Sequence, residues 1–527
     1  MTTLTIPITR PAVSVTADRL TAWLRVHRVS LAWVLPVLML GSVAHLWNLS
    51  GTLNAQNEDE ATYVAQAWAV LHGELAHYTY WYDHPPFGWI QIAGWAWTTR
   101  AFERYSSASF VGRELVAVYA IIAGGLLFVL GRRLGMNRFF SVFGVTLLLF
   151  SPLALSWAKI GFLDNLAVPW VLAAMVAARS PQKSGTSALW AAFFLAGAIL
   201  TKETFVLFLP FVLWMIWQNV DHSQRLRNVI QAVVLLVGLG MLYVLMAILK
   251  GELIPGDGHV SLIGSLIWQL ADRSGTGFIL APGSFANGLL LSWLARDWWL
   301  LAAGGIMLPV AFLRKELRPI AAATLVHALL PFRGGYLPNP YIIALLPLAS
   351  LVVAGGFNTI WQARGRFVAL SSTIWRRSLT VLLVLSFVGL AGPSWTSKAA
   401  NTLTSDDFAP AQQAVAWLKQ NAPASTGAQI VVEDTIWLDL INNGYGRTQV
   451  DWFFKLDVDS AVMERYIPQG ETIAQAWESI DYVVIPALDP VVIASRPTMM
   501  KALQHADLVA TFGAPPNANY SIYRVRH

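Results

Sequence analysis

The sequence has no cysteine and few charged residues, and each of these absences excludes a class of protein. Without cysteine, the 527-residue chain can form no disulfide framework and no Cys-based metal or redox site. Only 13% of its residues are charged, whereas a soluble globular protein carries about 25%. Because 56% of the residues are hydrophobic and 24 are tryptophan, the composition indicates a membrane protein.

The sequence also lacks a basic stripe, a solenoid repeat and a low-complexity tract. Its net charge of +6 is dispersed, which argues against nucleic acid as a partner. The Lys and Arg residues stand in small groups between apolar runs, an arrangement that sets the topology of membrane proteins. We therefore interpret them as topology signals.

Apolar runs near the spanning length of about 20 residues recur through the first three quarters of the chain. The clearer runs are 29–49, 114–131, 139–158, 203–219, 229–249, 298–313 and 338–356, and the shorter ones are 165–178, 187–200, 319–332 and 378–392. We predict a mainly α-helical, polytopic membrane domain over residues 29–392, with about eleven transmembrane helices. No cleavage site follows the first run, which is expected to stay as an anchor.

The basic residues predict the orientation of these helices. Arginines before the first run place residues 1–28 in the cytoplasm, and alternate connections then bring half of the 36 Lys and Arg to that side. An odd number of crossings puts the loops 50–113 and 250–290, and everything after 392, on the outer face. The pattern suits a multi-pass protein of the inner (plasma) membrane. The Gly-rich loop 250–290 is a candidate lid over an outer-face site.

The composition changes at residue 398, and residues 398–527 predict a soluble extracytoplasmic α/β domain. The segment "SDDFAPAQQAVAWLKQNAP" predicts a capped helix, "AQIVVED" and "ESIDYVVIPAL" predict strands, and "DLVATFG" and "NYSIYRVRH" predict closing strands. We interpret Glu433, Asp434 and Asp451 near the strand ends as solvated surface. Contact with a carbohydrate acceptor is the alternative.

The loop 50–113 carries a short amphipathic helix that acidic residues open. In "NEDEATYVAQAWAVL", apolar residues recur at helical spacing, but the segment is too short and polar to span and is expected along the outer interface. Asp59 and Glu60 lie at its N-terminus, where the helix dipole favours carboxylates, so they either cap the helix or do chemistry. We interpret Tyr63 and Trp68 as interface anchors rather than platforms for a sugar.

A second element, "YDHPPFGWIQIAGWAW", follows in the same loop. Its two prolines fix the backbone and hold His84 in a rigid, extended turn. The aromatic residues after the turn suit a membrane interface.

Five motifs occur in an order that resembles the glycosyltransferase C superfamily. They are "DEATYVAQA", "DHPPF", "KIGFLDNLAVPW", "LTKETF" and "FRGGYLPNPYIIALLPLASL". The ordered set, which covers residues 29–392, is most similar to the protein O-mannosyltransferases and the lipid A aminoarabinose transferases. The resemblance implies an inverting glycosyltransferase that takes a sugar from a polyprenyl-phosphate donor to a lipid, glycan or protein acceptor at the outer face.

The resemblance also implies the acidic residues of the site. By motif, Asp59 would be the catalytic base with Glu60 beside it, and Asp164 would be the second outer acid. A carboxylate in reach of the acceptor hydroxyl can take its proton as the hydroxyl attacks, and a single displacement inverts the anomeric centre. The alternative for Asp164 is a helix N-cap.

The residues that would meet the donor phosphate follow from the same motifs. Asp83 and His84 would form the pair before the prolines, Lys202 would meet the phosphate, and Arg333 and Tyr341 match more loosely. Cations at the membrane edge would stabilise the leaving phosphate, although Lys202 and Arg333 could also be unspecialised residues at helix ends. The family pair is commonly acid and lysine, and the charge of an imidazole in place of that lysine is conditional.

No cofactor is expected. A divalent cation between Asp59 and Asp164 is conceivable, but the cationic residues make it unnecessary, so we do not favour it. Two other functions remain open. A transporter or flippase of lipid-linked glycans would place acids in mid-span and show a repeat of two halves, and a non-catalytic assembly protein would tolerate loss of each site residue.

Overall fold

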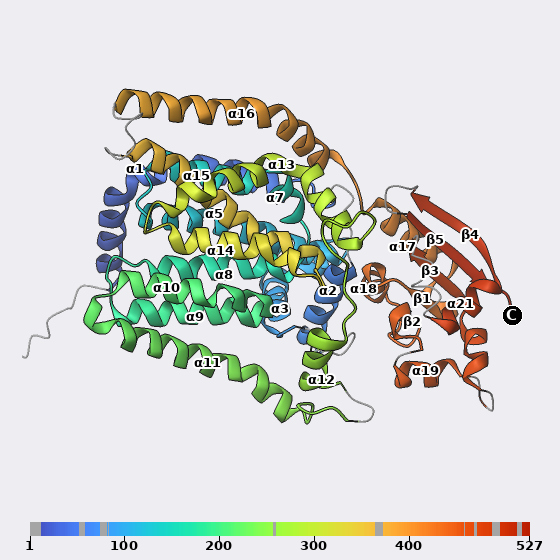
Figure 1. The fold of residues 1–527 in the computed structure, drawn as a ribbon. Coiled ribbons are helices and arrows are strands. Elements are labelled where there is room, and N and C mark those ends of the chain that lie inside the picture. Colours follow the sequence, from blue (N-terminus) through green and yellow to red (C-terminus); the bar gives the residue numbers. More distant parts are fainter. Residues whose placement is uncertain are drawn as a thin grey trace, which may run out of the picture.

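The helices up to residue 404 form a bundle, and the rest of the chain forms a small α/β domain at one end of it (Figure 1). The computed structural model describes residues 12–51, 58–73, 82, 84–256, 260–363, 373–457, 459–467, 469, 472–486, 496–513 and 519–527. The helices of the bundle are α1 Ala12–Leu46, α2 Glu58–Leu71, α3 Phe87–Thr99, α4 Ala101–Arg104, α5 Ser109–Arg133, α6 Arg138–Phe150, α7 Pro152–Trp157, α8 Leu163–Ala178, α9 Gly185–Thr201, α10 Leu209–Asn219, α11 Arg225–Leu249, α12 Leu262–Ile267, α13 Phe285–Phe312, α14 Arg318–Leu329, α15 Ile342–Gln362 and α16 Thr373–Thr404.

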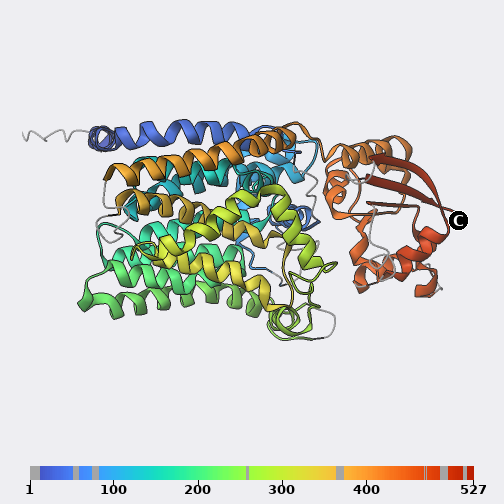
Figure 2. The same ribbon diagram turned by 45° about the horizontal axis from the view of Figure 1, so that its top comes forward.

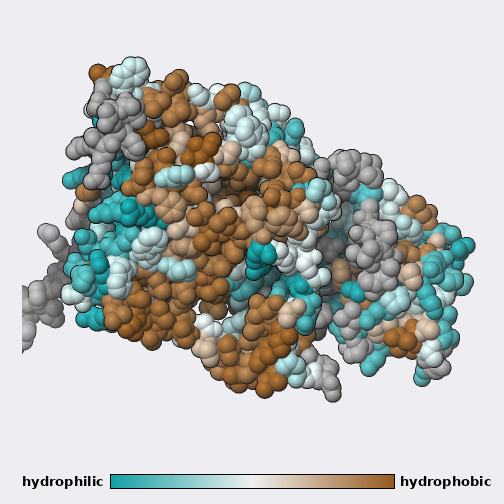
Figure 3. Space-filling model, viewed as in Figure 1, coloured by the Kyte–Doolittle hydropathy of each residue, from teal (hydrophilic) through white to brown (hydrophobic). Residues whose placement is uncertain are grey.

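The surface of the bundle is that of a multi-pass membrane protein. Hydrophobic side chains cover it, whereas hydrophilic ones gather at the end opposite the small domain and on the small domain itself (Figure 3). Five helical stretches of the described chain are long and apolar enough to cross a membrane: Leu24–Leu46, Ser109–Arg133, His222–Leu249, Asn339–Gln362 and Thr373–Asn421. Shorter apolar helices, among them α6, α8 and α9, lie between them, and the number of eleven crossings stays a prediction.

Several of the predicted spans differ from the structure in their bounds, and three of the differences involve a break, a kink or an extension. The run 139–158 is broken at Ser151, whose side chain caps α7 and which Pro152 follows at the first helical position. The run 298–313 is the second part of α13, which is kinked at Asp297. The last helix, α16, continues past residue 392 to Thr404 and thereby connects the bundle to the small domain.

The described connections that the charge pattern assigns to the cytoplasm, 134–137, 179–184, 220–224 and 313–317, lie together at one end of the bundle (Figure 2). Arg314 donates to Gln362 (2.9 Å), and Arg138 donates to Ser30 (3.1 Å), so residues far apart in sequence meet there. The first turn of α2 and the turn before α3 lie at the opposite end, beside the small domain. The structure therefore separates the two sets of loops as the charge pattern predicts, and the outward assignment of the second set stays a prediction.

The core of the bundle is formed by α8 and α15, which the other helices surround. In the most apolar stretch of α15, 89% of the residues are buried inside the protein, whereas the share is 11% in α11 and 17% in α1. The outer helices α1, α11 and α16 instead expose large apolar side chains, such as Met39, Val234 and Leu385. Lipid is the environment in which such exposed faces are stable.

The small domain is a five-stranded sheet with helices packed on it. Its strands are β1 Ile430–Val432, β2 Val450–Trp452, β3 Tyr482–Pro486, β4 Ala506–Gly513 and β5 Asn519–Val525, and its helices are α17 Ala409–Asn421, α18 Asp434–Asn442, α19 Ser460–Tyr466 and α21 Pro497–Gln504. The strand order is β2-β1-β3-β5-β4; β1 pairs in parallel with β2 and β3, and β5 is antiparallel to β3 and β4. The register aligns Ile430 with Val450 and Tyr482. The four predicted strands and the predicted helix are confirmed, and β2 was not predicted.

Helix α18 attaches the small domain to α2, the helix that opens with the predicted catalytic acids. Thr62 of α2 donates to Asp434, and the Ala108 amide donates to the Asp439 carboxylate (2.6 Å). Next to them, the rings of Trp68 and Trp437 meet edge to face at 6.3 Å. The small domain therefore rests directly on α2 and on the residues just before α5.

The expectation that the acids near the strand ends are solvated is wrong. Glu433, Asp434 and Asp451 are only 3%, 1% and 5% exposed. Glu433 accepts from the hydroxyls of Thr435 (2.6 Å) and Tyr520 (2.8 Å), and Asp451 pairs with Arg465 (2.5 Å). These acids stabilise the domain and its contact with α2, because buried carboxylates need such partners.

The contact between the small domain and the bundle is expected to weaken as the pH rises. Burial raises the pKa of Asp439 from 3.8 to about 7, against the opposing hydrogen bond from Ala108. The folded protein holds this proton more tightly than the unfolded one. The contribution of Asp439 to the free energy of unfolding is therefore fully present below pH 3.8 and is lost as the pH rises through about 7. Asp439→Asn keeps the acceptor and removes the charge, so above neutral pH the variant should be more stable by roughly 2–4 kcal/mol.

Thermal unfolding followed from acidic to alkaline pH measures this difference. The wild type should lose stability as the pH rises, and Asp439→Asn should lose less of it. Parallel pH profiles for the two proteins would contradict the prediction.

Candidate functional site

The first turn of α2 is fixed by a buried ion pair. Glu60 is 1% exposed, and Arg113 of α5 donates to both of its oxygens, from Nε to Oε1 (2.7 Å) and from Nη2 to Oε2 (2.6 Å). The Gly161 amide donates to Oε1 as well (2.5 Å). Arg113 also reaches the Leu49 carbonyl after α1 (2.7 Å). Glu60 thus joins α2 to α5 and to the loop before α8.

This arrangement distinguishes Glu60 from its neighbour Asp59. The carboxylate of Glu60 is occupied by an arginine and an amide, so the geometry makes it a positioning residue rather than a base. Asp59 is exposed. An exposed carboxylate on a rigidly held helix end is accessible to an acceptor from the aqueous phase.

Tyr63 connects Asp59 to the second motif. It lies one helical turn after Asp59, so the two side chains share a face of α2. The Tyr63 ring meets the His84 ring edge-on, with centroids 5.8 Å apart. Tyr63 and Trp68 are 5% and 9% exposed, so the expectation that they anchor the protein in the interface is wrong. The Tyr63 side of α2 therefore packs against the turn that carries His84.

His84 meets Lys202 and Glu203, which follow α9. Its Nδ1 lies 2.9 Å from Glu203 Oε2, and its Nε2 lies 2.8 Å from Lys202 Nζ. Asp164, in the first turn of α8, interacts electrostatically with Lys202, His84 and Glu203. Asp164 and Lys202 are each 5% exposed. Two predicted phosphate-binding residues and one predicted acid thus lie in one cluster, together with Glu203, which was not predicted.

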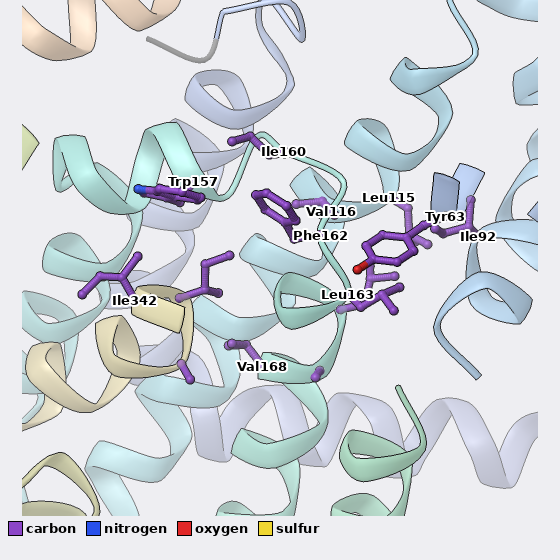
Figure 4. Packing of buried hydrophobic residues seen from close by; sticks show 14 of the residues in the cluster. Tyr63, Ile92, Leu115, Val116, Trp157, Ile160, Phe162, Leu163, Val168 and Ile342 are labelled. Carbon is purple, nitrogen blue, oxygen red and sulfur yellow. The ribbon is translucent and has the colours of Figure 1, made fainter. Parts of the chain in front are cut away.

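The loop before α8 connects this cluster to the N-terminal end of α2. Gly161, which donates to Glu60, is three residues before Asp164. A Cβ on Gly161 would lie 3.0 Å from Glu60 Oε1, so only glycine fits without displacing the glutamate. Figure 4 shows Tyr63, Phe162 and Leu163 among the packed side chains of the core at this place.

A second glycine lets α3 approach α8 and α9. A Cβ on Gly88 would lie 2.5 Å from Leu163 Cδ2 and 3.3 Å from the Thr201 carbonyl oxygen. Gln91, one turn later, donates to the Thr201 hydroxyl (2.8 Å) and accepts from Trp170 (2.8 Å). This close packing holds the His84 turn against the residues before Asp164 and Lys202.

Gly88→Ala is expected to lower activity without removing a polar group. The added methyl group would push α3 away from Leu163, which should destabilise the protein by about 1–3 kcal/mol and separate His84 from Asp164 and Lys202. Gly94, on the same helix, has no atom within 4 Å of an added Cβ. Gly94→Ala should therefore be neutral or stabilising by up to about 1 kcal/mol. Equal activity of the two variants in a transfer assay would contradict the close-packing argument.

Arg333 and Tyr341 lie at the edge of the described site. Arg333 is exposed and interacts electrostatically with Tyr341, whose hydroxyl donates to the His327 carbonyl (2.8 Å). The His327 ring packs against Phe208 with centroids 4.6 Å apart, in the 3₁₀ helix Glu203–Phe208 that begins at Glu203. Ring contacts thus join Tyr341 through His327 to Phe208. Within the described residues, neither Arg333 nor Tyr341 forms a hydrogen bond or ion pair with Lys202.

Three further predictions concern Asp83, a bound metal ion and the loop 250–290. Asp83 lies outside the described residues. No group of three His, Asp or Glu side chains within the described ranges could hold a metal ion. The loop 250–290 is attached to the segment after Arg333, because the Thr276 amide donates to the Gly335 carbonyl (3.0 Å) and Leu337 donates to the Thr276 hydroxyl (3.0 Å).

Comparison with known proteins shows which fold this arrangement belongs to. No protein-family model and no curated protein matches the chain. Among solved structures, ArnT from Cupriavidus metallidurans bound to undecaprenyl phosphate is similar at a TM-score of 0.57 and 11% identity, over 93% of this chain and 98% of that one. The protein has the glycosyltransferase C fold.

Two further structures with this fold are similar over most of the chain. The Archaeoglobus fulgidus oligosaccharyltransferase tethered with an acceptor peptide has a TM-score of 0.52 at 11% identity, over 96% of this chain and 75% of that one. The mycobacterial arabinofuranosyltransferase AftD has a TM-score of 0.50 at 14% identity, over 95% of this chain and 40% of that one. The predicted fold class, a polytopic membrane protein with a C-terminal α/β domain, is confirmed.

Proposed function

We propose that the protein is an inverting glycosyltransferase that moves a sugar from a polyprenyl-phosphate donor to an acceptor at the outer face of the inner membrane. The observation that carries the proposal is the cluster of Asp164, His84 and Lys202 beside the helix that Asp59 opens. The shared fold with ArnT bound to undecaprenyl phosphate supports the class of donor. The acceptor is a lipid, a glycan or a protein.

The different burial of the site residues supports different roles for them, with phosphate binding inside the site and proton transfer at its exposed edge. Lys202 is 5% exposed, and a cation at such a depth is most effective against the charge that the leaving phosphate gathers; the His84 side chain, 13% exposed, lies beside it. Asp59 lies at the exposed edge, where the hydroxyl of an acceptor can reach it from water. In this scheme Asp59 takes the proton of the acceptor while the phosphate departs on the opposite side of the anomeric carbon.

Other residues assist this scheme. In the proposal Asp164, which interacts electrostatically with Lys202 and His84, orients these two groups. Arg333 and Tyr341 belong to the outer part of the donor site, and Asp83 precedes His84 directly. No resident metal is part of the proposal, because Lys202 and His84 supply the positive charge that the phosphate needs.

The proposal is tested with the full-length protein in liposomes that contain a panel of polyprenyl-phosphate sugars. The expected result is release of free polyprenyl phosphate together with transfer of one sugar to an added acceptor. A flippase would instead move the intact donor across the bilayer and release no lipid phosphate. Lys202→Ala should raise the KM for the donor and leave the preference among acceptors unchanged, since Lys202 faces the phosphate only.

A further inference from the structure

The turn that carries His84 is held by a side chain of helix α11. The Tyr243 hydroxyl donates to the Tyr82 carbonyl (3.2 Å) and to the His84 carbonyl (3.1 Å). A hydroxyl has one hydrogen, so the two carbonyls share it. The rings of Tyr82 and Tyr243 also pack together, with centroids 5.9 Å apart. One residue of α11 thus fixes the backbone of this turn at two points.

The two prolines after His84 explain why the turn takes a donor from another helix. A backbone carbonyl in a turn often accepts from the amide three residues later. For Tyr82 that residue is Pro85, which has no N–H, and Pro86 after it has none either. Tyr82 is 4% exposed, and a buried carbonyl without a donor is costly. The Tyr243 hydroxyl therefore stabilises this turn by supplying a donor that the prolines cannot.

The segment that follows α11 holds the side chain of Tyr82 as well. The Tyr82 hydroxyl donates to Glu252 Oε2 (2.6 Å), and Glu252 pairs with Lys250 (3.3 Å). The Glu252 carbonyl accepts from the Leu262 amide at the start of α12 (2.9 Å), so Glu252 is itself fixed. Both the backbone and the side chain of Tyr82 are thus attached to the same end of α11.

These contacts act on the site rather than on the attachment of α11. Helix α11 packs along α9, and this packing holds α11 without the Tyr243 hydroxyl. The close approach of α3 at Gly88 fixes the residues after the prolines, and Tyr243 fixes the residues before them. The imidazole of His84, which lies 2.8 Å from Lys202 Nζ, projects from the backbone that is held in this way.

We propose that Tyr243 is a positioning residue for the donor phosphate, because its hydroxyl fixes the backbone from which His84 meets Lys202. This role rests on the proposed function, and it requires the place of the His84 side chain rather than a particular charge on its ring. Without the hydroxyl, the turn keeps its prolines but loses its attachment to α11. His84 then spends a smaller share of the time beside Lys202, and the phosphate binds more weakly.

Binding of polyprenyl phosphate to the full-length protein in detergent tests this role. Tyr243→Phe keeps the ring beside Tyr82 and removes the donor, so the Kd should rise roughly three- to tenfold, the effect of about one hydrogen bond. Tyr82→Phe removes the bond to Glu252 and should raise the Kd in the same way. Tyr445→Phe is the matched control, because Tyr445 is buried in the small domain and its hydroxyl donates to the Ala422 carbonyl (2.9 Å). This control should lower the Tm slightly and leave the Kd unchanged.

A double-variant cycle shows whether the effect passes through His84. His84→Ala should raise the Kd roughly tenfold, because it removes the ring beside Lys202. Adding Tyr243→Phe to His84→Ala should then change the Kd by less than about twofold, since no imidazole is left to position. A structural role alone would give the same rise in both backgrounds.

The outcomes distinguish the role of Tyr243 from the function on which it rests. An unchanged Kd in Tyr243→Phe, or an equal rise in the wild-type and His84→Ala backgrounds, would overturn the positioning role and leave the glycosyltransferase proposal standing. An equal rise in Tyr445→Phe would also overturn it, because the affinity would then follow stability. A wild type that does not bind polyprenyl phosphate would overturn both.

Discussion

Asp59→Asn is expected to slow sugar transfer about 10²- to 10⁴-fold, the contribution of a general base. The amide keeps the shape of the side chain but cannot take a proton from the acceptor. Asp59 is exposed, and the first turn of α2 is held by Glu60 and Arg113, so the fold should be unaffected. The affinity for the donor should also stay close to that of the wild type, because the phosphate is proposed to bind at Lys202 and His84.

The measurement is the rate of release of polyprenyl phosphate, with Tm and donor binding recorded on the same samples. Asp221→Asn is the matched control, since Asp221 is an exposed acid in the connection between α10 and α11. Transfer at the wild-type rate by Asp59→Asn would move the base to another carboxylate, of which Asp164 is the first candidate.

Arg113→Met is expected to have the second large effect, on stability and on activity together. It leaves the carboxylate of Glu60 buried without its cation, which should lower the free energy of unfolding by about 3–5 kcal/mol. It also removes the contact that fixes the first turn of α2, so the position of Asp59 is no longer held. Urea or thermal unfolding and a transfer assay measure the two effects.

Two further variants isolate the cause. Arg104→Met breaks an ion pair of similar length with Glu114 (2.6 Å), but Arg104 is 42% exposed, so the loss should be under about 1 kcal/mol. Glu60→Leu combined with Arg113→Met removes both buried charges and should recover part of the stability, but not the activity, because Gly161 then lacks its acceptor. A stable, fully active Arg113→Met would contradict the positioning role of Glu60.

The local elements around the site follow from the sequence. Helical spacing of apolar residues and acids in the first turn predict α2, which the structure confirms as Glu58–Leu71. The strands of the small domain are predicted because short apolar runs, rich in β-branched and aromatic residues, stand between turns. Ser151 followed by Pro152 is a helix-start signal within the run 139–158, but the continuous hydrophobicity of that run conceals it.

The partners of the site residues do not follow from the sequence, because they are joined only by packing. Glu203 stands directly after Lys202, but nothing local shows that its carboxylate reaches His84, 119 positions earlier. Arg113 lies at the start of an apolar helix, where a basic residue is usually a topology signal, and its pairing with Glu60 requires α5 and α2 to meet. Strand β2 has three residues and becomes a strand only through its pairing with β1.

The docking of α18 explains a further difference between expectation and structure. Polar residues near strand ends of a soluble domain are usually solvated, which is why Glu433 and Asp434 were expected at the surface. Contact with α2 buries this end of the domain, with Asp434 held by Thr62 and Asp439 by Ala108. The helix that the small domain contacts is thus the one that carries Asp59, the proposed base.

The most direct test of the account is an experimental structure of the full-length protein with polyprenyl phosphate bound. The account predicts that the phosphate lies within hydrogen-bond reach of Lys202 Nζ and His84, next to Asp164. Asp59 should lie on the far side of the space that the sugar of the donor would fill. A phosphate bound at the end of the bundle opposite the small domain would contradict it. So would a phosphate bound near the small domain but remote from Lys202.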